Sequence, residues 1–283
     1  MEHEFDSRRR YNLRTAELDI NEFCCLFVLY NFLINMNVMI FAAGLGTRLK
    51  PLTDNMPKAL VPVGGKPLLG LLIDKLKASV KETELLNVVI NTHHFGQQIV
   101  DYIASEYTGQ GCDIKFSDER DQLLETGGGL KKALPLFGSD EPVLVHNVDI
   151  LSNIDLADFY KGHVADTDAL VTMLVSERKT KRYLLFDDSD RLVGWTNIET
   201  GEVKSPYSSL NVGSCRMYAY SGIQVVSPQL LPLMDSWNGK FSIIDFYLSI
   251  CDKVCIKCDL RTDLRLLDVG KIDSIAEAEK FVY

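Results

Sequence analysis

From residue 38 to the end of the chain, short apolar runs alternate with segments of helical periodicity, and this alternation most constrains the fold. The near-continuous apolar character of strands buried on both faces occurs at residues 38–43, 86–91, 112–116, 143–146 and 169–175. Helices are expected between them, at residues 67–77, 95–105, 128–134 and 156–163. Because strands joined by helices favour parallel crossovers, we predict an α/β fold with a mostly parallel central mixed sheet and helices on both faces.

The second half of the chain is less regular. Residues 183–186 and 191–195 predict a hairpin around a turn of acidic residues and serine. Further strands are expected at 218–226, 254–260 and 264–267, and helices at 228–234, 243–251 and 272–281. No Pro/Gly/Ser-rich linker, repeat or low-complexity block interrupts the sequence, so we predict a single domain.

The opening of the chain has a different character. Residues 1–22 are charged and polar, and an apolar run follows at 23–30. That order is typical of a signal peptide or an anchor, but Asn31, Asn35 and Asn37 interrupt the run before it reaches the roughly 20 residues that a membrane span needs. We therefore expect residues 1–35 to be an N-terminal extension, either disordered or a misassigned start, with no membrane role. Residues 36–283 then form the folded domain.

Charge and cysteine content exclude other classes. The chain has 30 Lys and Arg against 39 Asp and Glu, a formal charge of -9, and its only compact basic cluster is 8–10. This argues against nucleic acid as a partner, which requires a basic footprint. Seven scattered cysteines do not describe a disulfide framework, so we expect a reducing, cytoplasmic location.

A glycine-containing loop follows the first predicted strand. Gly44 and Gly46 lack side chains where a loop can bring its amides against an anion, and Arg48 and Lys58 add two cations nearby. The spacing matches neither the dinucleotide fingerprint nor the P-loop. Amides, a guanidinium and an ammonium in one short segment are suited to holding a triphosphate.

With this loop the chain resembles the sugar-phosphate nucleotidyltransferases, or NDP-sugar pyrophosphorylases. Their signature Gly-x-Gly-Thr-Arg, then Pro, then Pro-Lys, is complete from Gly44 to Lys58. Supporting matches are Asn-Thr-His-His-Phe from Asn91, Glu-Thr-Gly-Gly-Gly from Glu125, Val-His-Asn-Val-Asp ending at Asp149, and Leu-Asp-Val-Gly ending at Gly270. The resemblance implies a single Rossmann-like nucleotidyltransferase domain over residues 36–283.

The resemblance implies a reaction in which an NTP and a sugar 1-phosphate give an NDP-sugar and pyrophosphate. The sugar phosphate attacks the α-phosphorus in line, and it is largely a dianion at neutral pH because its second pKa is about 6, so no general base is needed. By resemblance Arg48 and Lys58 are the catalytic cations, and Asp149 and Asp268 bind Mg²⁺. The nucleotide-binding residues implied are Ala43, Gly44, Gly46, Thr47, Thr126, Gly127 and Gly128. The glycines 127–129 are expected to precede a helix.

The acceptor side is less determined. The Glu-Lys-Pro segment with which many family members hold the sugar phosphate is absent. Arg182 is the candidate replacement, although a solvated basic loop explains it equally well. Ser221 and Gly222 fall where the family reads sugar hydroxyls, with core packing as the alternative. The Glu-Thr-Gly-Gly-Gly version of its motif resembles the branch that joins UTP to N-acetylmuramate 1-phosphate, which favours a role in cell-envelope glycan synthesis or recycling.

Several alternatives stay open. They are a guanylyltransferase for mannose or heptose 1-phosphate, a cytidylyltransferase for phosphocholine, and a regulatory subunit that keeps the fold without turnover. Survival of Lys58, Asp149 and Asp268 favours an enzyme over the last of these. A homodimer is also left open. Cys255 and Cys258 are not expected to bind metal, since residues three apart on a strand face opposite sides.

Overall fold

The computed structural model describes residues 35–81, 85–109 and 111–282. The chain divides into two units, Met1–Ile34 and Asn35–Tyr283, and the fold below is that of the second. The N-terminal extension expected over 1–35 lies outside the described residues except for Asn35.

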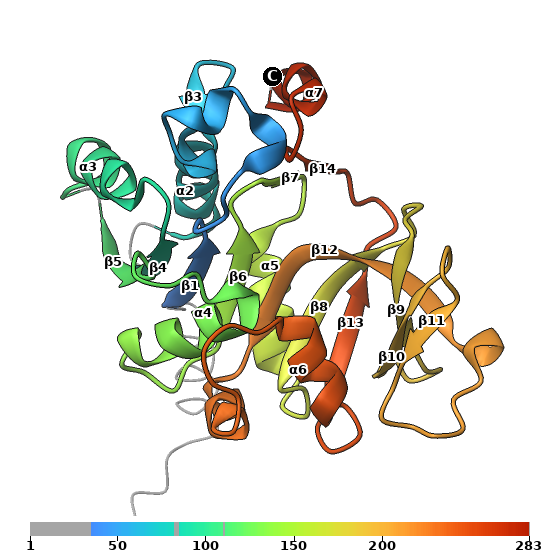
Figure 1. Cartoon of the computed structure of the whole chain (residues 1–283). Helices are drawn as coiled ribbons and strands as arrows, with labels where there is room; N and C mark the ends of the chain where they lie inside the picture. Colours follow the sequence, from blue (N-terminus) through green and yellow to red (C-terminus); the bar gives the residue numbers. More distant parts are fainter. Residues whose placement is uncertain (1–34, 82–84, 110, 283) are drawn as a thin grey trace, which may run out of the picture. The chain divides into compact units, whose positions relative to one another are not determined.

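Four parallel strands form one half of the central sheet, in the order β6 (Val143–Asn147), β1 (Met36–Phe41), β4 (Leu86–Thr92) and β5 (Cys112–Asp118). β1 pairs in parallel with both β4 and β6, so the chain builds the sheet first to one side of β1 and then to the other (Figure 1). The carboxyl ends of β1 and β6 therefore meet at a point where strand order reverses. Open α/β sheets bind ligands at such points.

The other half of the sheet is organised by β12 (Arg216–Val226), a long strand that pairs antiparallel with three others: β6, β8 (Val171–Ser176) and β9 (Arg182–Phe186). β13 (Ile256–Leu260) adds to β8, while β10 (Leu192–Asn197) and β11 (Glu202–Lys204) extend from β9. The β12–β8 register shifts between Tyr220 and Gln224, and Gly222 there has φ +80°. This bulge bends β12 between the central sheet and the β9–β11 strands (Figure 1).

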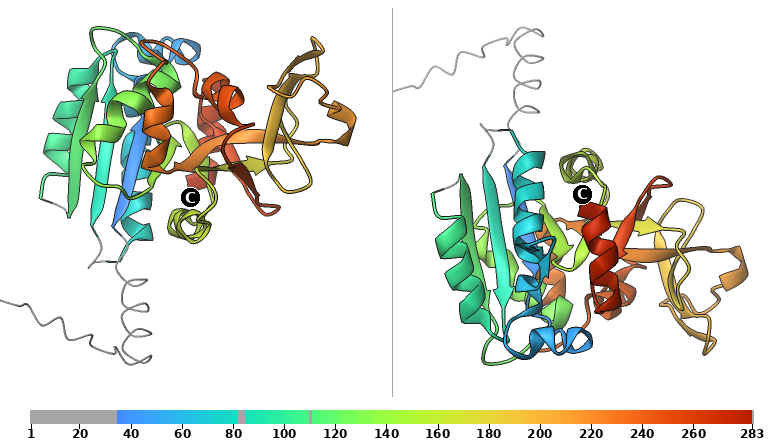
Figure 2. Two further views of the ribbon diagram at one scale, coloured as in Figure 1. Left: turned by 90° about the horizontal axis from the view of Figure 1, so that it is seen from below. Right: turned by 90° about the horizontal axis from the view of Figure 1, so that it is seen from above.

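Helices cover both faces of the sheet (Figures 1 and 2). They are α2 (Leu68–Ser79), α3 (Gly96–Glu106), α4 (Glu125–Ala133), α5 (Leu156–Ala165), α6 (Ile243–Ile250) and α7 (Asp273–Val282). Met39, Val89 and Val145 belong to one core cluster with residues of α4 and α6. Alternate residues such as Val38 and Ile40 are equally buried on the opposite face. Burial on both faces explains the near-continuous apolar runs of β1, β4, β6 and β8. The expectation does not hold for β5, an edge strand whose residues alternate between half-buried and exposed.

Short elements complete the fold. Two small antiparallel pairs join β2 (Pro62–Val63) to β3 (Lys66–Pro67) and β7 (Ile150–Ser152) to β14 (Leu266–Asp268). The loop after β1 contains the 3₁₀ turns η1 (Thr47–Leu49), η2 (Leu52–Asp54) and η3 (Lys58–Leu60). The remaining turns are η4 (Leu134–Leu136), η5 (Val212–Ser214) and η6 (Pro228–Met234).

The predicted fold class, a mixed central sheet between helices, is confirmed, as is the β9–β10 hairpin. Two local predictions differ. The expected helix at 228–234 is 3₁₀ because Pro232 within it cannot donate to an α-helical ladder. The first strand ends at Phe41 rather than at residue 43, because a side chain, not a neighbouring strand, takes the next two backbone amides.

The helix expected at 128–134 is present as α4 but begins earlier, at Glu125. The prediction that the glycines 127–129 precede a helix is therefore wrong, because all three lie inside α4. A Cβ at Gly127 would lie 2.3 Å from the Phe241 ring, and one at Gly128 would lie 2.2 Å from the carbonyl oxygen of Gly239. Here glycine lets a helix approach the segment before α6 closely, and packing outweighs the low helix propensity of glycine.

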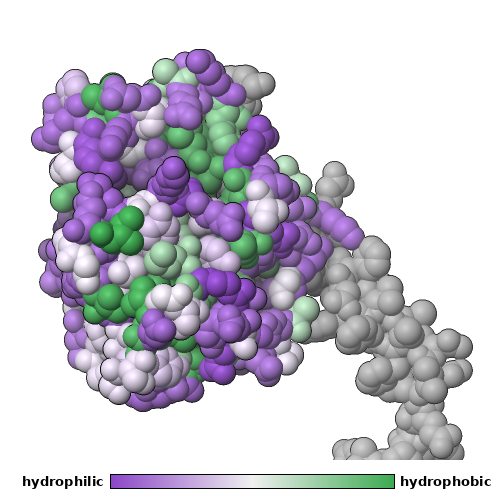
Figure 3. Space-filling model, turned by 90° about the vertical axis from the view of Figure 1, so that its right-hand side faces the viewer, coloured by the Kyte–Doolittle hydropathy of each residue, from purple (hydrophilic) through white to green (hydrophobic). Residues whose placement is uncertain are grey.

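Among the described residues, every helix is too short or too polar to span a bilayer. The face that includes the β9–β11 strands is mainly hydrophilic, with apolar residues in separate groups (Figure 3). Exposed apolar side chains near these strands include Ile198 and Met217.

Substituting Gly128 by Ala should destabilise the protein. The added methyl group meets backbone, which cannot rotate away, so we expect the free energy of unfolding to fall by about 1–3 kcal/mol. Gly162→Ala is the matched control, because Gly162 also lies in a helix but has nothing within 4 Å of an added Cβ. That variant should gain up to about 1 kcal/mol. Urea unfolding of both variants tests the contrast, and equal behaviour of the two would contradict it.

Candidate active site

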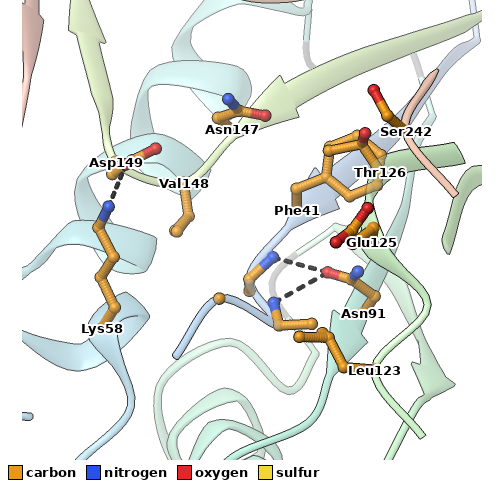
Figure 4. Close-up of a pocket in the computed structure, with 13 residues that line it drawn as sticks. Phe41, Lys58, Asn91, Leu123, Glu125, Thr126, Asn147, Val148, Asp149 and Ser242 are labelled. Atoms are coloured by element: carbon orange, nitrogen blue, oxygen red, sulfur yellow. Dashed lines mark hydrogen bonds and ion pairs between the residues drawn. The ribbon is translucent and has the colours of Figure 1, made fainter. Parts of the chain in front are cut away.

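A cavity of about 360 Å³ opens at the carboxyl ends of β1 and β6 (Figure 4). Its walls come from the end of β1 and the loop after it, from β4, from the segment around the start of α4, from the end of β6 and from the residue before α6. The lining residues are Phe41, Ala42, Ala43, Gly44, Lys58, Asn91, Leu123, Glu125, Thr126, Asn147, Val148, Asp149 and Ser242.

The loop after β1 is folded by contacts of its own. Gly46 has φ +63°, a left-handed conformation that favours glycine, and its carbonyl accepts hydrogen bonds from the Leu49 amide and the Thr53 hydroxyl, both at 2.8 Å. Leu49 is fully buried and anchors the turn. Gly44 lies on the cavity with nothing within 4 Å of an added Cβ, so this part of the loop is open to a ligand.

The first two amides of this loop are already engaged. The side-chain oxygen of Asn91 accepts hydrogen bonds from the backbone N–H groups of Ala42 at 2.7 Å and of Ala43 at 3.1 Å (Figure 4). Ala43 therefore lines the cavity, but its amide is not available to a phosphate. The amides that remain for an anion in this loop begin at Gly44.

The side chains of Lys58 and Asp149 both line the cavity and form an ion pair with each other (Figure 4). Lys58 begins η3 and Asp149 follows β6, so this contact joins the two sides of the site. Their side chains are only 12% and 16% exposed. An ammonium and a carboxylate in such partial shelter act more strongly on a bound ligand than they would in open solvent.

Asp268 is held beside Asp149 by backbone pairing. β14 pairs with β7 so that Asp268 lies opposite Ile150, and the Val269 amide donates to the Asp149 carbonyl at 2.8 Å. A Cβ at Gly270 would lie 2.6 Å from Asp268 Oδ1 and 2.9 Å from Arg48 Nη2, so the Arg48 guanidinium reaches the same corner. The predicted catalytic and metal-binding side chains thus come to neighbouring positions.

The donor set at this corner fits Mg²⁺ only in part. No group of three or more His, Cys, Asp or Glu within the described ranges is arranged to hold a metal ion. Asp149 and Asp268 together supply hard carboxylate oxygens, which suit Mg²⁺ when phosphate oxygens and water complete the shell. A site that needs its substrate to be complete is common for this ion.

His146 lies beneath the cavity, three residues before Asp149. Its burial lowers its pKa to about 4, an effect that the hydrogen bond with the Asn147 carbonyl opposes. The imidazole is therefore neutral at physiological pH and adds no charge to the site.

Of the remaining residues predicted to bind the nucleotide, some line the cavity and others do not. Thr126 lines the cavity, and its hydroxyl accepts a hydrogen bond from the Ile243 amide at 3.0 Å, which ties α4 to α6. Thr47 is exposed in η1 beside Arg48. Gly127 and Gly128 do not line the cavity and are packed as described above.

A second cavity of about 510 Å³ adjoins the first, and Ser242 lines both. Arg182 lies here rather than in the first cavity, together with Arg178 and Lys204. Lys204 pairs with Asp245 at 3.1 Å, and Arg178 donates to the Tyr220 carbonyl at 3.1 Å.

Ser221 and Gly222 are placed by the β12 bulge. The Ser221 hydroxyl is buried and donates to the Leu174 carbonyl at 2.5 Å, so it faces the core and neither cavity. Gly222 lies against Asn147 of the first cavity: a Cβ there would be 2.8 Å from Asn147 Nδ2. The structure thus keeps Gly222 near the site and takes Ser221 away from it.

Comparison with known proteins agrees with this geometry. Residues 37–191, more than half of the chain, match the family described as Nucleotidyl transferase. The chain is 34% identical over 224 residues to the N-acetylmuramate alpha-1-phosphate uridylyltransferase of Caulobacter vibrioides, covering 77% of this chain and 86% of that one. The protein of that name from Neisseria meningitidis serogroup B is 43% identical over 120 residues, which cover 42% of this chain and 49% of that one.

Solved structures show the same fold. The UDP-glucose pyrophosphorylase of Acinetobacter baumanii superposes with a TM-score of 0.68 at 13% identity, covering 87% of this chain and 92% of that one. The chain belongs to the nucleotidyl transferase family. The expected enzyme class, a nucleotidyltransferase, is confirmed.

Some residues of this nucleotidyltransferase site were not singled out from the sequence. Asn91 and Asn147 each lie near the end of a parallel strand, and both belong to motifs that support the resemblance, so a signal for them existed. Glu119 had none, because it stands between Asp118 and Arg120 in what reads as a charged loop. The structure buries it at 1% exposure.

The two loop glycines of the nucleotidyltransferase should respond differently to substitution by Ala. Gly46→Ala places a Cβ 2.9 Å from Thr53 in a left-handed residue, so we expect a loss of about 1–2 kcal/mol in the free energy of unfolding. Gly44→Ala has room in the protein, so stability should be unchanged while nucleotide affinity falls. Thermal unfolding and calorimetric titration with nucleotide distinguish the two. Unchanged affinity in Gly44→Ala would remove this residue from the binding surface.

Proposed function

We propose that the protein transfers a uridylyl group from UTP to N-acetylmuramate 1-phosphate, giving UDP-N-acetylmuramate and pyrophosphate. The similar proteins of Caulobacter and Neisseria carry this activity in their names. The Glu-Thr-Gly-Gly-Gly motif that suggested the same branch forms the first residues of α4 beside the cavity. The Lys58–Asp149 pair in the cavity carries the proposal that this chain is active, since it presents both charges that nucleotidyl transfer needs.

The chain's own residues supply charge and position in this proposal. The acceptor phosphate attacks the α-phosphorus, the bond to the β-phosphate oxygen breaks, and pyrophosphate leaves with the electron pair. Lys58 neutralises charge on the α-phosphate and on the departing pyrophosphate, and Arg48 holds the rest of the triphosphate. The Lys58 ammonium has to exchange its Asp149 partner for phosphate oxygens when the nucleotide binds.

We assign Asp149 and Asp268 as the residues that would hold Mg²⁺. When bound, the ion supplies positive charge to the phosphate oxygens of the nucleotide. The acceptor would occupy the second cavity, where Arg182 and Arg178 offer cations to an anionic sugar and Ser242 marks the junction with the nucleotide. A role in cell-envelope glycan synthesis or recycling follows from this substrate pair.

The test is pyrophosphate release with Mg²⁺ across a grid of NTPs and acceptors. The NTPs are ATP, CTP, GTP, UTP and dTTP; the acceptors are the 1-phosphates of N-acetylmuramate, N-acetylglucosamine, glucose, mannose and heptose, with phosphocholine as the outlier. Turnover confined to UTP with N-acetylmuramate 1-phosphate supports the proposal. Turnover with another combination of NTP and acceptor would change the proposed substrates but keep the proposed reaction class. A folded protein silent throughout the grid contradicts the proposal.

Lys58→Ala should remove most of the activity. Loss of one preorganised charge at a developing negative charge typically costs about 100- to 1,000-fold in kcat. Lys50→Ala is the matched control in the same loop, since Lys50 forms an exposed pair with Asp54 at 3.2 Å and is 61% exposed. Its kcat should stay close to that of the wild type. Steady-state kinetics on variants checked by thermal unfolding decide, and full activity in Lys58→Ala would overturn the assignment.

Asp149→Asn should abolish the Mg²⁺ dependence of both turnover and nucleotide affinity. The amide keeps the size of the side chain but lacks the negative charge that holds the cation. UTP titrations with and without Mg²⁺ measure this in the absence of acceptor. If Mg²⁺ still strengthens UTP binding in the variant to the wild-type extent, the metal site lies elsewhere.

A further inference from the structure

A buried carboxylate lies directly behind the cavity. Glu119 is 1% exposed and Asn91 is 3% exposed, and the Asn91 Nδ2 group donates to Glu119 Oε1 at 2.8 Å. Within the described part of the chain Glu119 forms no ion pair with Lys, Arg or His. A buried carboxylate without a cation is costly, so hydrogen bonds must hold it in place.

The carboxylate sets the direction of the Asn91 amide. A carboxylate oxygen accepts hydrogen bonds, so it faces the NH₂ group of Asn91 and turns the Asn91 oxygen towards the loop after β1. That oxygen accepts from the amides of Ala42 and Ala43 (Figure 4). If the Asn91 amide were reversed, donors would face donors on the loop side. The carboxylate therefore selects the orientation that holds the first wall of the cavity.

The second oxygen of the same carboxylate holds another wall. Glu119 Oε2 accepts a hydrogen bond from the Leu124 amide at 3.0 Å. Leu124 immediately precedes α4, whose first residues Glu125 and Thr126 line the cavity. One buried side chain thus links the glycine loop to the start of α4.

The surroundings of Glu119 hold it in position. Its amide donates to the Thr92 carbonyl at 2.8 Å, and its carbonyl lies 2.7 Å from His93 Nδ1. A Cβ at Gly129 would lie 2.8 Å from Glu119 Oε1 and 3.2 Å from Asn91 Nδ2. The third glycine of the Glu-Thr-Gly-Gly-Gly motif therefore provides the space in which the carboxylate and the amide meet.

We propose that Asn91 and Glu119 are positioning residues that together fix two walls of the cavity, the loop after β1 and the start of α4. The Glu119 side chain does this without touching the nucleotide. The inference rests on the proposed function only in taking this cavity as the NTP site. According to this proposal, the buried pair contributes to nucleotide affinity as well as to the stability of the fold.

The hydrogen-bond directions lead to a test by exchange of the two side-chain types. In Glu119→Gln, the new amide can satisfy either Asn91 or Leu124 with its oxygen, and its NH₂ group then faces a donor at the other. In Asn91→Asp, two carboxylates face each other. In the double variant, the carboxylate at position 91 accepts from the loop amides and from the NH₂ group at position 119. The amide oxygen at position 119 accepts from Leu124, so every bond has a donor and an acceptor again.

We expect each single variant to bind Mg²⁺-UTP about 10- to 100-fold more weakly than the wild type, because the cavity walls are no longer held in position. The affinity of the double variant for Mg²⁺-UTP should return to within about threefold of the wild type. Independent effects would instead multiply the two single losses. Hydrogen exchange should become faster in residues 40–46 and 119–126 of each single variant and return towards normal in the double variant. Binding is measured by calorimetry on the full chain, with Mg²⁺-GTP in parallel.

Asn37→Ala is the matched control. Asn37 is a buried Asn at the other end of the β1–β4 pair, and its NH₂ group donates to the Ser139 hydroxyl at 2.9 Å. It should lower the melting temperature while leaving UTP affinity within about twofold of the wild type. A drop in UTP affinity for Asn37→Ala equal to that of the single variants would show that any loss of stability weakens binding, and would overturn the proposal.

Other outcomes also decide. If both single variants keep the UTP affinity and the hydrogen-exchange rates of the wild type, the proposal is overturned. It is also overturned if the UTP affinity of the double variant falls by the product of the two single losses. If the single variants do not fold, a double variant that folds and binds UTP supports it, and one that fails to fold or to bind overturns it. A preference for GTP in the wild type changes the proposed function but not this test, because recovery is then scored with GTP.

Discussion

The parallel pairing of β1 with β4 on one side and β6 on the other is the constraint on which the rest of the structure depends. Strand order reverses at β1, so the connections that leave the carboxyl ends of β1 and β6 run to opposite sides along the sheet and leave an opening between them. The loop after β1 and the turn after β6 meet there. Lys58 comes from the first and Asp149 from the second, and neither segment alone would make the site.

An ammonium and a carboxylate at one place serve different partners in the proposed reaction, because the phosphates are anionic and the proposed Mg²⁺ is a cation. In the Lys58–Asp149 pair each charge compensates the other. Such compensation avoids leaving a partly buried charge alone, which would be costly. In the proposed reaction Lys58 takes phosphate oxygens and Asp149 takes Mg²⁺ as its new partner, so neither charge is left uncompensated.

Much of the fold was predictable, because strands buried on both faces leave apolar runs that few other structures produce. The cavity residues Gly44, Lys58, Thr126 and Asp149 were also predictable, through motif spacing near strand ends. The early start of α4 was not, since the low helix propensity of glycine suggests a loop at Gly127, and only the contacts with Phe241 and Gly239 show why the helix includes it. The sequence left Ser221 open between a sugar contact and core packing, and it did not indicate that Glu119 is buried. Both depend on hydrogen bonds to segments distant in sequence, Leu174 and Asn91 respectively.

β12 joins the parallel strands to the β9–β11 strands, with Gly222 at the bend between them. Its last residues pair with β6 below the first cavity, and its first residues pair with β9, where Arg182 stands at the edge of the second. The β9–β11 strands extend from the outer part of β12 and add no strand to the parallel half of the sheet, although Leu184, Phe186 and Leu192 pack in the same core cluster as Met39 and Val145. The exposed side chains there, such as Arg182 and Lys204, can vary without disturbing the parallel strands. Under the proposed assignment of the second cavity to the acceptor, one nucleotide-binding core can therefore be combined with different acceptor pockets. The shared strand still keeps the two halves in register. On the same assignment, a change of acceptor requires new exposed side chains on these strands and leaves Lys58 and Asp149 in place.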